Sequence, residues 1–195
     1  MNSISLENIK SLKASQLTEL LLKLLHLEYG KYKFPDCQIY VPQNITTADG
    51  GEDGRIKTTD FRDSKWIKDT FCLFQSKATS MSKGDCKNEI LNTKNDALKK
   101  QIEELFEENG TYILFTTDDY VQQNLQERID GFREAIESVK GKEYAEKSKI
   151  EIYEANKIRD WANEYISAIS YVQLCCGIVK PLGLQIWSAS RPKIG

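Results

Sequence analysis

The chain has 195 residues, of which 40% are hydrophobic, and its 27 basic and 29 acidic side chains leave a formal net charge of −2. Such a length is most economically one domain whose core is large enough to fold without disulfide bonds. The charge excludes the bulk basicity of a histone-like or arm-type nucleic-acid binder but permits a local basic surface. His26 is the only histidine, which nearly excludes mechanisms that need a histidine base, and we expect it to be a structural or surface residue.

Cysteine usage and hydropathy indicate the compartment. The five cysteines are an odd number without a CxxC spacing, as is typical of reduced thiols in the cytoplasm. No run approaches the roughly 18 apolar residues of a membrane span, and the N-terminal residues lack the pattern of a secretory signal. We therefore expect a soluble, cytoplasmic protein without a membrane partner.

The first half of the chain predicts a helix, three strands and a second helix. Leucines recur at helical spacing from Ser15 to Leu27, which predicts a mostly buried helix. Residues 84–110 are highly charged with spaced apolar positions, which predicts one long amphipathic helix ending at Gly110. Between these helices, β-branched and aromatic residues favour strands in CQIYVPQN, GRIKTT and FCLFQSKAT, residues 37–44, 54–59 and 71–79.

The second half alternates strands with helices. TYILFTT, residues 111–117, is a short apolar run typical of a buried parallel strand. A helix is predicted over 124–141, a strand over 149–155 and a last helix over 156–176. The whole order predicts an α/β protein with a mixed central sheet flanked by helices.

The C-terminal residues differ in composition from the rest. Residues 176–195 contain two prolines, three glycines and few charges, and they show no period. We expect one domain over residues 1–175, followed by a tail or linker over 176–195 that either wraps the domain or leads into a further region.

One stretch, TADGGEDGRIKT at residues 47–58, carries three carboxylates, Asp49, Glu52 and Asp53, within a glycine-rich segment. A solvated turn between strands would need no ligand there. The spacing also partly follows a calcium-binding EF-hand loop, but a glycine and two basic residues occupy its ligand positions, which argues against calcium. A third interpretation is one half of a catalytic metal site.

Polar residues near the end of a buried strand favour the third interpretation. Gln75 and Lys77 are two residues apart on one strand, so their side chains share one face of the sheet. Asp53 stands at the entrance of the preceding strand and can converge with them. Burying such groups costs free energy unless they meet partners or an open cleft. A cleft that holds a carboxylate and a metal would satisfy both conditions.

These residues resemble a known motif. GEDG at 51–54 and FQSK at 74–77 resemble the GxDG and QxK motif of the Mrr-like PD-(D/E)xK nucleases, which have the restriction-endonuclease-like fold. Together with YILFTT and EANKIRDWAN further along, the chain resembles the N-terminal nuclease domain of Avs-type antiphage STAND NTPases. The order of elements follows this resemblance from about residue 15 to about residue 165.

The resemblance implies a Mg²⁺-dependent or Mn²⁺-dependent endonuclease acting on double-stranded DNA. It implies that Asp53, Gln75 and the backbone carbonyl of Ser76 bind the metal. Lys77 would orient or deprotonate a water molecule and stabilise charge on the phosphate. The domain would be the effector of an antiviral defence protein, activated when NTPase regions bring several copies together as a homo-oligomer.

Two departures weaken the resemblance. Gln75 takes the place usually held by an acid and supplies no charge. A further carboxylate from the first helix is common in the family, and Glu19 is a weak candidate because it falls nearly opposite the leucine stripe; the family position could instead coincide with Thr18. The alternative is therefore a catalytically inactive nuclease-fold module for DNA binding or protein assembly.

Basic residues behind the motif are further candidates. Lysines of the predicted helix over 84–110 and of the segment before it usually form a solvated face. Lys83 and Lys87, the nearest to Lys77, could contact phosphate weakly, and such binding would decline steeply with salt.

Overall fold

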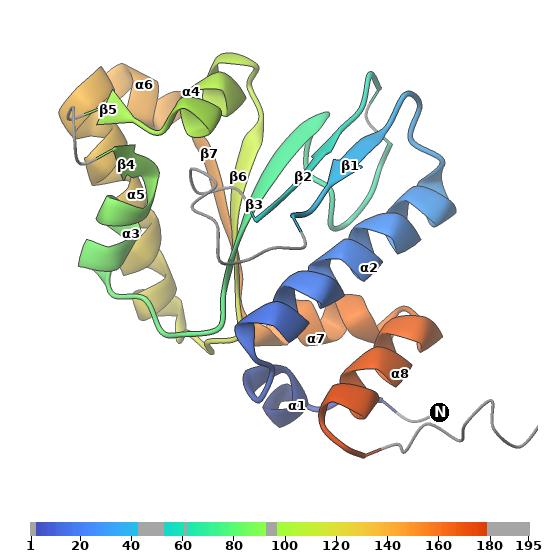
Figure 1. Ribbon diagram of the computed structural model, residues 1–195. Helices are drawn as coiled ribbons and strands as arrows, with labels where there is room; N and C mark the ends of the chain where they lie inside the picture. The colour runs from blue at the N-terminus through green and yellow to red at the C-terminus, as the bar shows by residue number, and fades with distance from the viewer. Residues whose placement is uncertain (1–2, 43–52, 61, 93–96, 179–195) are drawn as a thin grey trace, which may run out of the picture.

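A five-stranded mixed sheet with helices on both faces forms the centre of the computed structural model, which describes residues 3–42, 53–60, 62–92 and 97–178 (Figure 1). The strand order is β1-β2-β3-β6-β7. The pairs β1–β2 and β2–β3 are antiparallel, and β3–β6 and β6–β7 are parallel. This confirms the predicted fold class. The strands are β1 (Gln38–Tyr40), β2 (Gly54–Lys57), β3 (Phe71–Lys77), β6 (Thr111–Thr116) and β7 (Lys149–Tyr153).

The helices form two layers around this sheet (Figure 1). One face is covered by α1 (Leu6–Lys10), α2 (Ala14–Tyr32), α7 (Ala155–Asn163) and α8 (Ile166–Cys175). The other is covered by α3 (Lys83–Ile90), α4 (Lys100–Glu107), α5 (Gln122–Lys140) and α6 (Lys142–Lys147). A small second sheet pairs β4 (Leu91–Asn92) with β5 (Ala97–Leu98) between α3 and α4.

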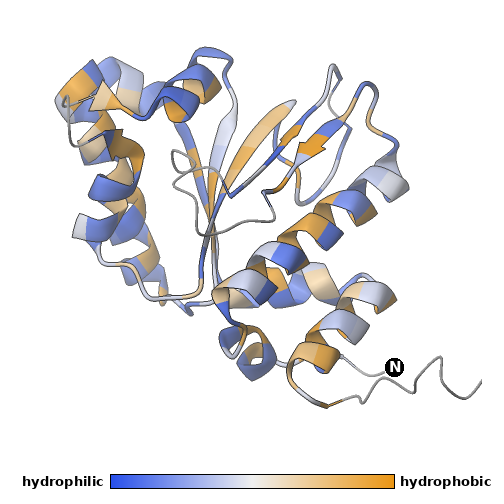
Figure 2. Cartoon of the chain, in the orientation of Figure 1, coloured by the Kyte–Doolittle hydropathy of each residue, from blue (hydrophilic) through white to orange (hydrophobic). Residues whose placement is uncertain are grey.

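Each face of the sheet has its own hydrophobic core, because successive side chains of a strand point to opposite faces. In β3, Cys72 and Phe74 pack with α2 and α7, whereas Phe71 and Leu73 pack with the helices of the other layer. All six residues of β6 are buried, as expected for a central parallel strand. Figure 2 shows the resulting pattern: hydrophobic central strands, and helices on which hydrophobic and hydrophilic residues alternate.

Two predicted helices are divided in the structure. The segment predicted as one helix over 84–110 forms α3, the β4–β5 pair and α4, so that prediction was wrong. The first helix ends at its C-cap residue Leu91, whose backbone is extended with φ −91° and ψ 143°. The last predicted helix is divided into α7 and α8, because Tyr165 has an extended backbone with φ −131° and ψ 119°.

A buried carboxylate ties the N-terminal and C-terminal helices together. Glu28 of α2 is completely buried and accepts hydrogen bonds from Ser64 Oγ at 2.7 Å, Trp161 Nε1 at 2.9 Å and Tyr165 Oη at 2.6 Å. The Trp161 ring also stacks on Trp66, with 5.6 Å between the ring centroids. Burial and the hydrogen bond to Glu28 raise the pKa of Tyr165. This cluster holds Trp161 in the position of a core anchor.

The remaining expectations concern the ends and the surface. His26 is exposed on α2. Among the described residues, no helix combines the length and apolar character that crossing a bilayer requires. Asp49, Glu52 and the residues 179–195 of the expected tail lie outside the described part of the chain.

Candidate active site

The start of β2 sets the direction of Asp53. Gly54 pairs with Phe74 across the β2–β3 ladder, and the backbone N–H of Asp53 donates to the carbonyl oxygen of Phe74 at 3.0 Å. Gly54 faces α2 so closely that a Cβ atom there would lie 3.0 Å from Cδ2 of Leu21. Since neighbouring residues of a strand point to opposite faces, Asp53 is directed to the face of Gln75 and not to that of α2.

Asp53 and Gln75 are in direct contact. Oδ2 of Asp53 accepts hydrogen bonds from Nε2 of Gln75 at 2.5 Å and from the backbone N–H of Ser76 at 2.7 Å. The register places the two residues opposite each other, one step beyond the Gly54–Phe74 pair. The structure therefore brings together the two ends of the motif, which are 22 positions apart in the sequence.

The other atom of the Gln75 amide is left unsatisfied. Gln75 is 4% exposed, and its Oε1 has no hydrogen-bond partner among the described residues. The Oγ atom of Ser76 is also buried and has no hydrogen-bond partner among the described residues. Leaving such a buried group without a partner costs about 1–3 kcal/mol, so an unsatisfied buried oxygen calls for a specific explanation, such as a bound ion or water.

The backbone of Ser76 also faces Asp53. In a strand, the N–H and the carbonyl of one residue point to the same neighbouring strand, and those of the next residue point to the opposite one. The N–H of Ser76 donates to Asp53, whereas the carbonyl of Lys77 accepts from Thr117 on the β6 side. The carbonyl of Ser76 is therefore directed to the same side as the Asp53 carboxylate.

Lys77 is held by an acidic residue of α3. Its Nζ lies 2.9 Å from Oε2 of Glu89, and Oε1 of the same carboxylate lies 3.4 Å from Nζ of Lys99. The three side chains are only 28%, 15% and 23% exposed, in the order Lys77, Glu89, Lys99. Glu89 was not a candidate from the sequence, and Lys99 was one of the helix lysines expected to form a solvated face. The signal for Glu89 was its place beside the buried Cys86 and Ile90 of α3, which puts it at the inner edge of that helix.

Tyr112 is a second buried polar residue on the same face of the sheet as Gln75. It is fully buried on β6, and its hydroxyl has no hydrogen-bond partner in the described part of the chain. Its pKa is raised well above the ordinary value, mainly by burial, with further contributions from Glu89, Cys86 and Asp53. The hydroxyl is thus a buried polar group within the hydrophobic core on the α3 and α5 side of the sheet, where the Tyr112 ring packs against Phe132.

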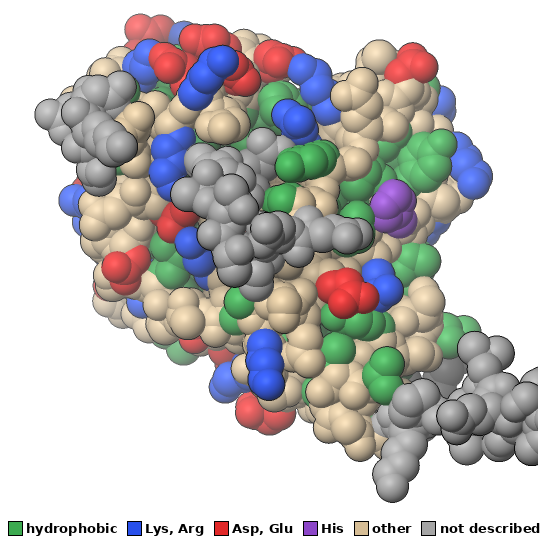
Figure 3. Space-filling model, in the orientation of Figure 1, with side chains coloured by type: hydrophobic (Ala, Val, Ile, Leu, Met, Phe, Trp, Pro, Cys, Tyr) green, Lys and Arg blue, Asp and Glu red, His purple; other side chains and the backbone are tan. Residues whose placement is uncertain are grey.

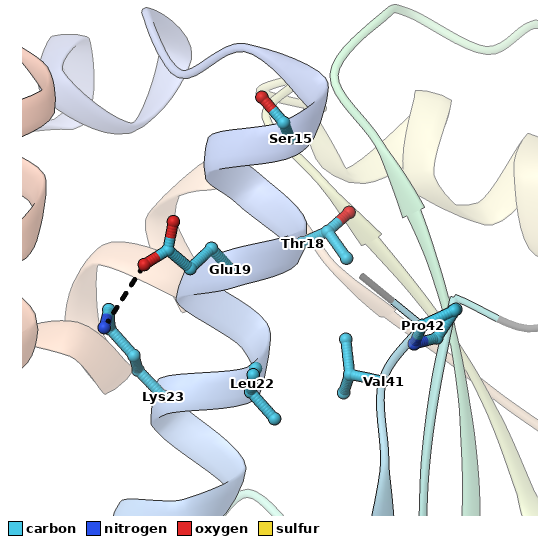
Figure 4. Close-up of a pocket in the computed structure, with 7 residues that line it drawn as sticks. All are labelled: Ser15, Thr18, Glu19, Leu22, Lys23, Val41 and Pro42. Atoms are coloured by element: carbon cyan, nitrogen blue, oxygen red, sulfur yellow. Dashed lines mark ion pairs between the residues drawn. The ribbon is translucent and has the colours of Figure 1, made fainter. Parts of the chain in front are cut away.

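Glu19 occupies a different place. It forms an ion pair with Lys23 at 3.3 Å and accepts a hydrogen bond from the Tyr171 hydroxyl at 3.1 Å, on the side of α2 that faces α8. Figure 4 shows Thr18 pointing toward Val41, whereas Glu19 points away, toward Lys23. Both residues line a pocket of about 420 Å³ between α2 and the end of β1. The structure does not direct Glu19 toward Asp53, whose side chain lies on the opposite face of the sheet.

The two predicted substrate lysines are bound to a surface acid. Lys83 and Lys87 of α3 form ion pairs with Glu134 of α5 at 2.6 Å and 2.5 Å, and all three side chains are at least 40% exposed. These contacts lower the pKa of Glu134, the hydrogen bond from Lys83 having the largest effect. The structure places both lysines against α5, whereas Lys77 pairs with Glu89 of α3.

The donor set near Asp53 is poor in acids. Within residues 3–42, 53–60, 62–92 and 97–178, no group of three or more His, Cys, Asp or Glu side chains could hold a metal ion. Among the described residues of the motif, the oxygen atoms on the Asp53 side are those of one carboxylate, one amide and one backbone carbonyl.

Comparison with known proteins adds no relative. No protein-family model, no curated protein and no solved structure matches the chain. The function is therefore argued from the geometry of the site.

Proposed function

We propose that this protein is a metal-dependent endonuclease domain that hydrolyses phosphodiester bonds of double-stranded DNA. The observation that carries the proposal is the contact of Asp53 with Gln75 near the end of β3, the strand that Lys77 ends. The buried amide oxygen of Gln75 has no hydrogen-bond partner among the described residues. At this end of the sheet, one face carries a carboxylate, a neutral oxygen donor and a lysine. The two oxygen groups suit a cation, and the lysine suits a phosphate group bound beside it.

The residues present fit Mg²⁺ or Mn²⁺. Mg²⁺ prefers oxygen ligands, keeps several waters and is often bound through only one or two carboxylates. Asp53 would supply the charge, and Oε1 of Gln75 and the carbonyl of Ser76 would supply neutral oxygens. The amide directs Nε2 toward Asp53, which is the favourable direction beside a carboxylate, whereas a cation there would favour the opposite orientation of the amide.

The chemistry divides between the metal and Lys77. When bound, the metal would lower the pKa of a coordinated water and neutralise charge on the phosphate. Lys77 would donate hydrogen bonds from Nζ to orient the attacking water and to stabilise the negative charge that develops on the phosphate oxygens. In the present structure this ammonium group is paired with Glu89, so it must turn at least partly from Glu89 to reach a phosphate.

The charge of the whole domain suits an enzyme that works in an assembly. The net charge is −2, and Figure 3 shows acidic and basic side chains interspersed on the visible described surface. DNA affinity depends on neutralising many phosphates, so one such domain would bind weakly at physiological salt. We propose that homo-oligomerisation of a cytoplasmic antiviral effector brings two sites together to cut both strands.

A second candidate function is a non-catalytic module that uses the same fold for DNA binding or protein assembly. The observation in its favour is the scarcity of acids, since Gln75 replaces a carboxylate and Glu19 is engaged elsewhere.

A plasmid-cleavage assay distinguishes the endonuclease from the non-catalytic module. Supercoiled plasmid would be incubated with Mg²⁺ or Mn²⁺ and a high concentration of the protein or of an artificially oligomerised form. We expect nicked and linear products from the wild type and none from Asp53→Ala or Lys77→Ala, whereas Lys100→Ala, a change at an 85% exposed side chain, should cleave normally. An intact plasmid under all conditions, or equal cleavage by the Asp53 and Lys77 variants, would refute the nuclease proposal.

A further inference from the structure

Glu89 forms ion pairs with two lysines, only one of which belongs to the predicted motif. We infer that Lys99 is a second phosphate-binding residue of this site, and that Glu89 is the counter-ion that holds Lys77 and Lys99 together until a substrate phosphate displaces it. This inference rests on the proposed function, because it takes the ligand to be a nucleic-acid backbone.

The backbone fixes Lys99 at the junction of three elements. Its N–H donates to the carbonyl of Ile90 at the end of α3, at 2.9 Å. Its own carbonyl accepts from the N–H groups of Ile102 and Glu103 and so begins α4. Lys77, 22 positions earlier, ends β3. Two ammonium groups from separate elements thus meet at one carboxylate, on supports that have little freedom to separate.

Burial distinguishes this triad from a surface ion-pair cluster of the same composition. The protein contains a similar cluster, Lys83 and Lys87 with Glu134, but those three side chains are 40–44% exposed. The triad of Lys77, Glu89 and Lys99 is 15–28% exposed and carries a net charge of +1. Because charge that is partly withdrawn from water is less screened, the excess cation attracts an anion more strongly here than at the surface.

One further feature concerns the start of α4. Its N-cap residue, Lys99, provides no side-chain capping bond, and Glu103 is the acidic residue of its first turn. The N-terminal N–H groups of this eight-residue helix therefore add partial positive charge beside Lys99.

The test measures DNA binding without cleavage. A fluorescently labelled 20-base-pair duplex would be titrated with the full chain in EDTA at several KCl concentrations, using anisotropy. We compare wild type with Lys99→Gln, with Glu89→Gln, and with the matched control Lys100→Gln, whose side chain pairs only with the neighbouring Glu104 among the described residues. Thermal unfolding would show that each variant is folded.

The inference makes three quantitative statements. Lys99→Gln should weaken binding roughly three- to tenfold and reduce the slope of log K against log[KCl] by about 0.9, the value for one phosphate contact. Lys100→Gln should change neither quantity. Glu89→Gln should strengthen metal-free binding by a similar roughly three- to tenfold factor, because both lysines are released from their counter-ion.

The outcomes separate this inference from the nuclease proposal. If Lys99→Gln keeps the wild-type slope, or if Glu89→Gln weakens the binding of a folded protein, the inference is overturned even when the plasmid is cut. If the slopes change as expected but no plasmid is cut, the phosphate site stands and the nuclease proposal fails. If the wild type does not bind the duplex at any salt concentration, the inference is overturned, and plasmid cleavage still decides the nuclease proposal.

Discussion

Replacing Glu28 by glutamine tests whether a buried carboxylate stabilises this fold. Oε1 accepts from both Trp161 and Tyr165, and Oε2 accepts from the Ser64 hydroxyl. That hydroxyl in turn accepts from the backbone N–H groups of Trp66 and Ile67, each at 3.1 Å, so both of its lone pairs are occupied. Glutamine can keep the two bonds at Oε1, but its NH₂ group would then face a serine oxygen that has no acceptor capacity left.

The expected change in the free energy of unfolding follows from these contacts. One hydrogen bond to a charged group is lost, worth about 1.5–3 kcal/mol, and two others become bonds to a neutral oxygen, worth about 0.5–1.5 kcal/mol each. Relief of the desolvation of a buried charge offsets part of this loss. We expect Glu28→Gln to lower the free energy of unfolding by about 2–4 kcal/mol.

The assay is urea unfolding followed by tryptophan fluorescence, because the Trp66–Trp161 stack lies beside Glu28. Glu19→Gln is the matched control: it is the same change on the same helix, at a side chain that is 54% exposed and pairs with Lys23. It should shift stability by no more than about 0.5 kcal/mol. A Glu28→Gln protein as stable as the wild type would show that the desolvation cost cancels the hydrogen bonds, and would refute the reasoning.

The remaining predictions concern the metal and the pH. Gln75→Glu places a second carboxylate opposite Asp53, so the variant should melt at a lower temperature than the wild type in EDTA and gain more from added Mg²⁺, a difference that calorimetry measures; equal shifts in both proteins would contradict the metal assignment. Burial raises the pKa of the Cys72 thiol from 9.0 to about 12. Because the folded value is the higher one, this thiol's contribution to stability is complete below pH 9.0 and is lost as the pH rises toward 12. Urea unfolding between pH 8 and 11 should therefore show a steeper alkaline loss in the wild type than in Cys72→Ala, and parallel curves would contradict the shift.

Much of the fold follows from local patterns. The leucine stripe after Ser15 predicts α2, and the uninterrupted apolar run TYILFTT predicts the central strand β6. The alternation of side chains along β3 puts Gln75 and Lys77 on one face, and the antiparallel return from β2 brings Asp53 opposite Gln75. These inferences succeed because periodicity and short connections act over a few residues, within which the sequence has few alternatives.

The sequence by itself determined an α/β sheet and the residues of a motif; the tertiary structure decided what surrounds them. Glu89 meets Lys77 only because α3 folds back over the end of β3, and Lys99 meets Glu89 only because residues predicted as one helix are divided between α3 and α4. Likewise, the buried partners of Glu28 lie 36, 133 and 137 positions away. The direction of a charged side chain on an amphipathic helix depends on its partners across space, and local spacing carries no information about them.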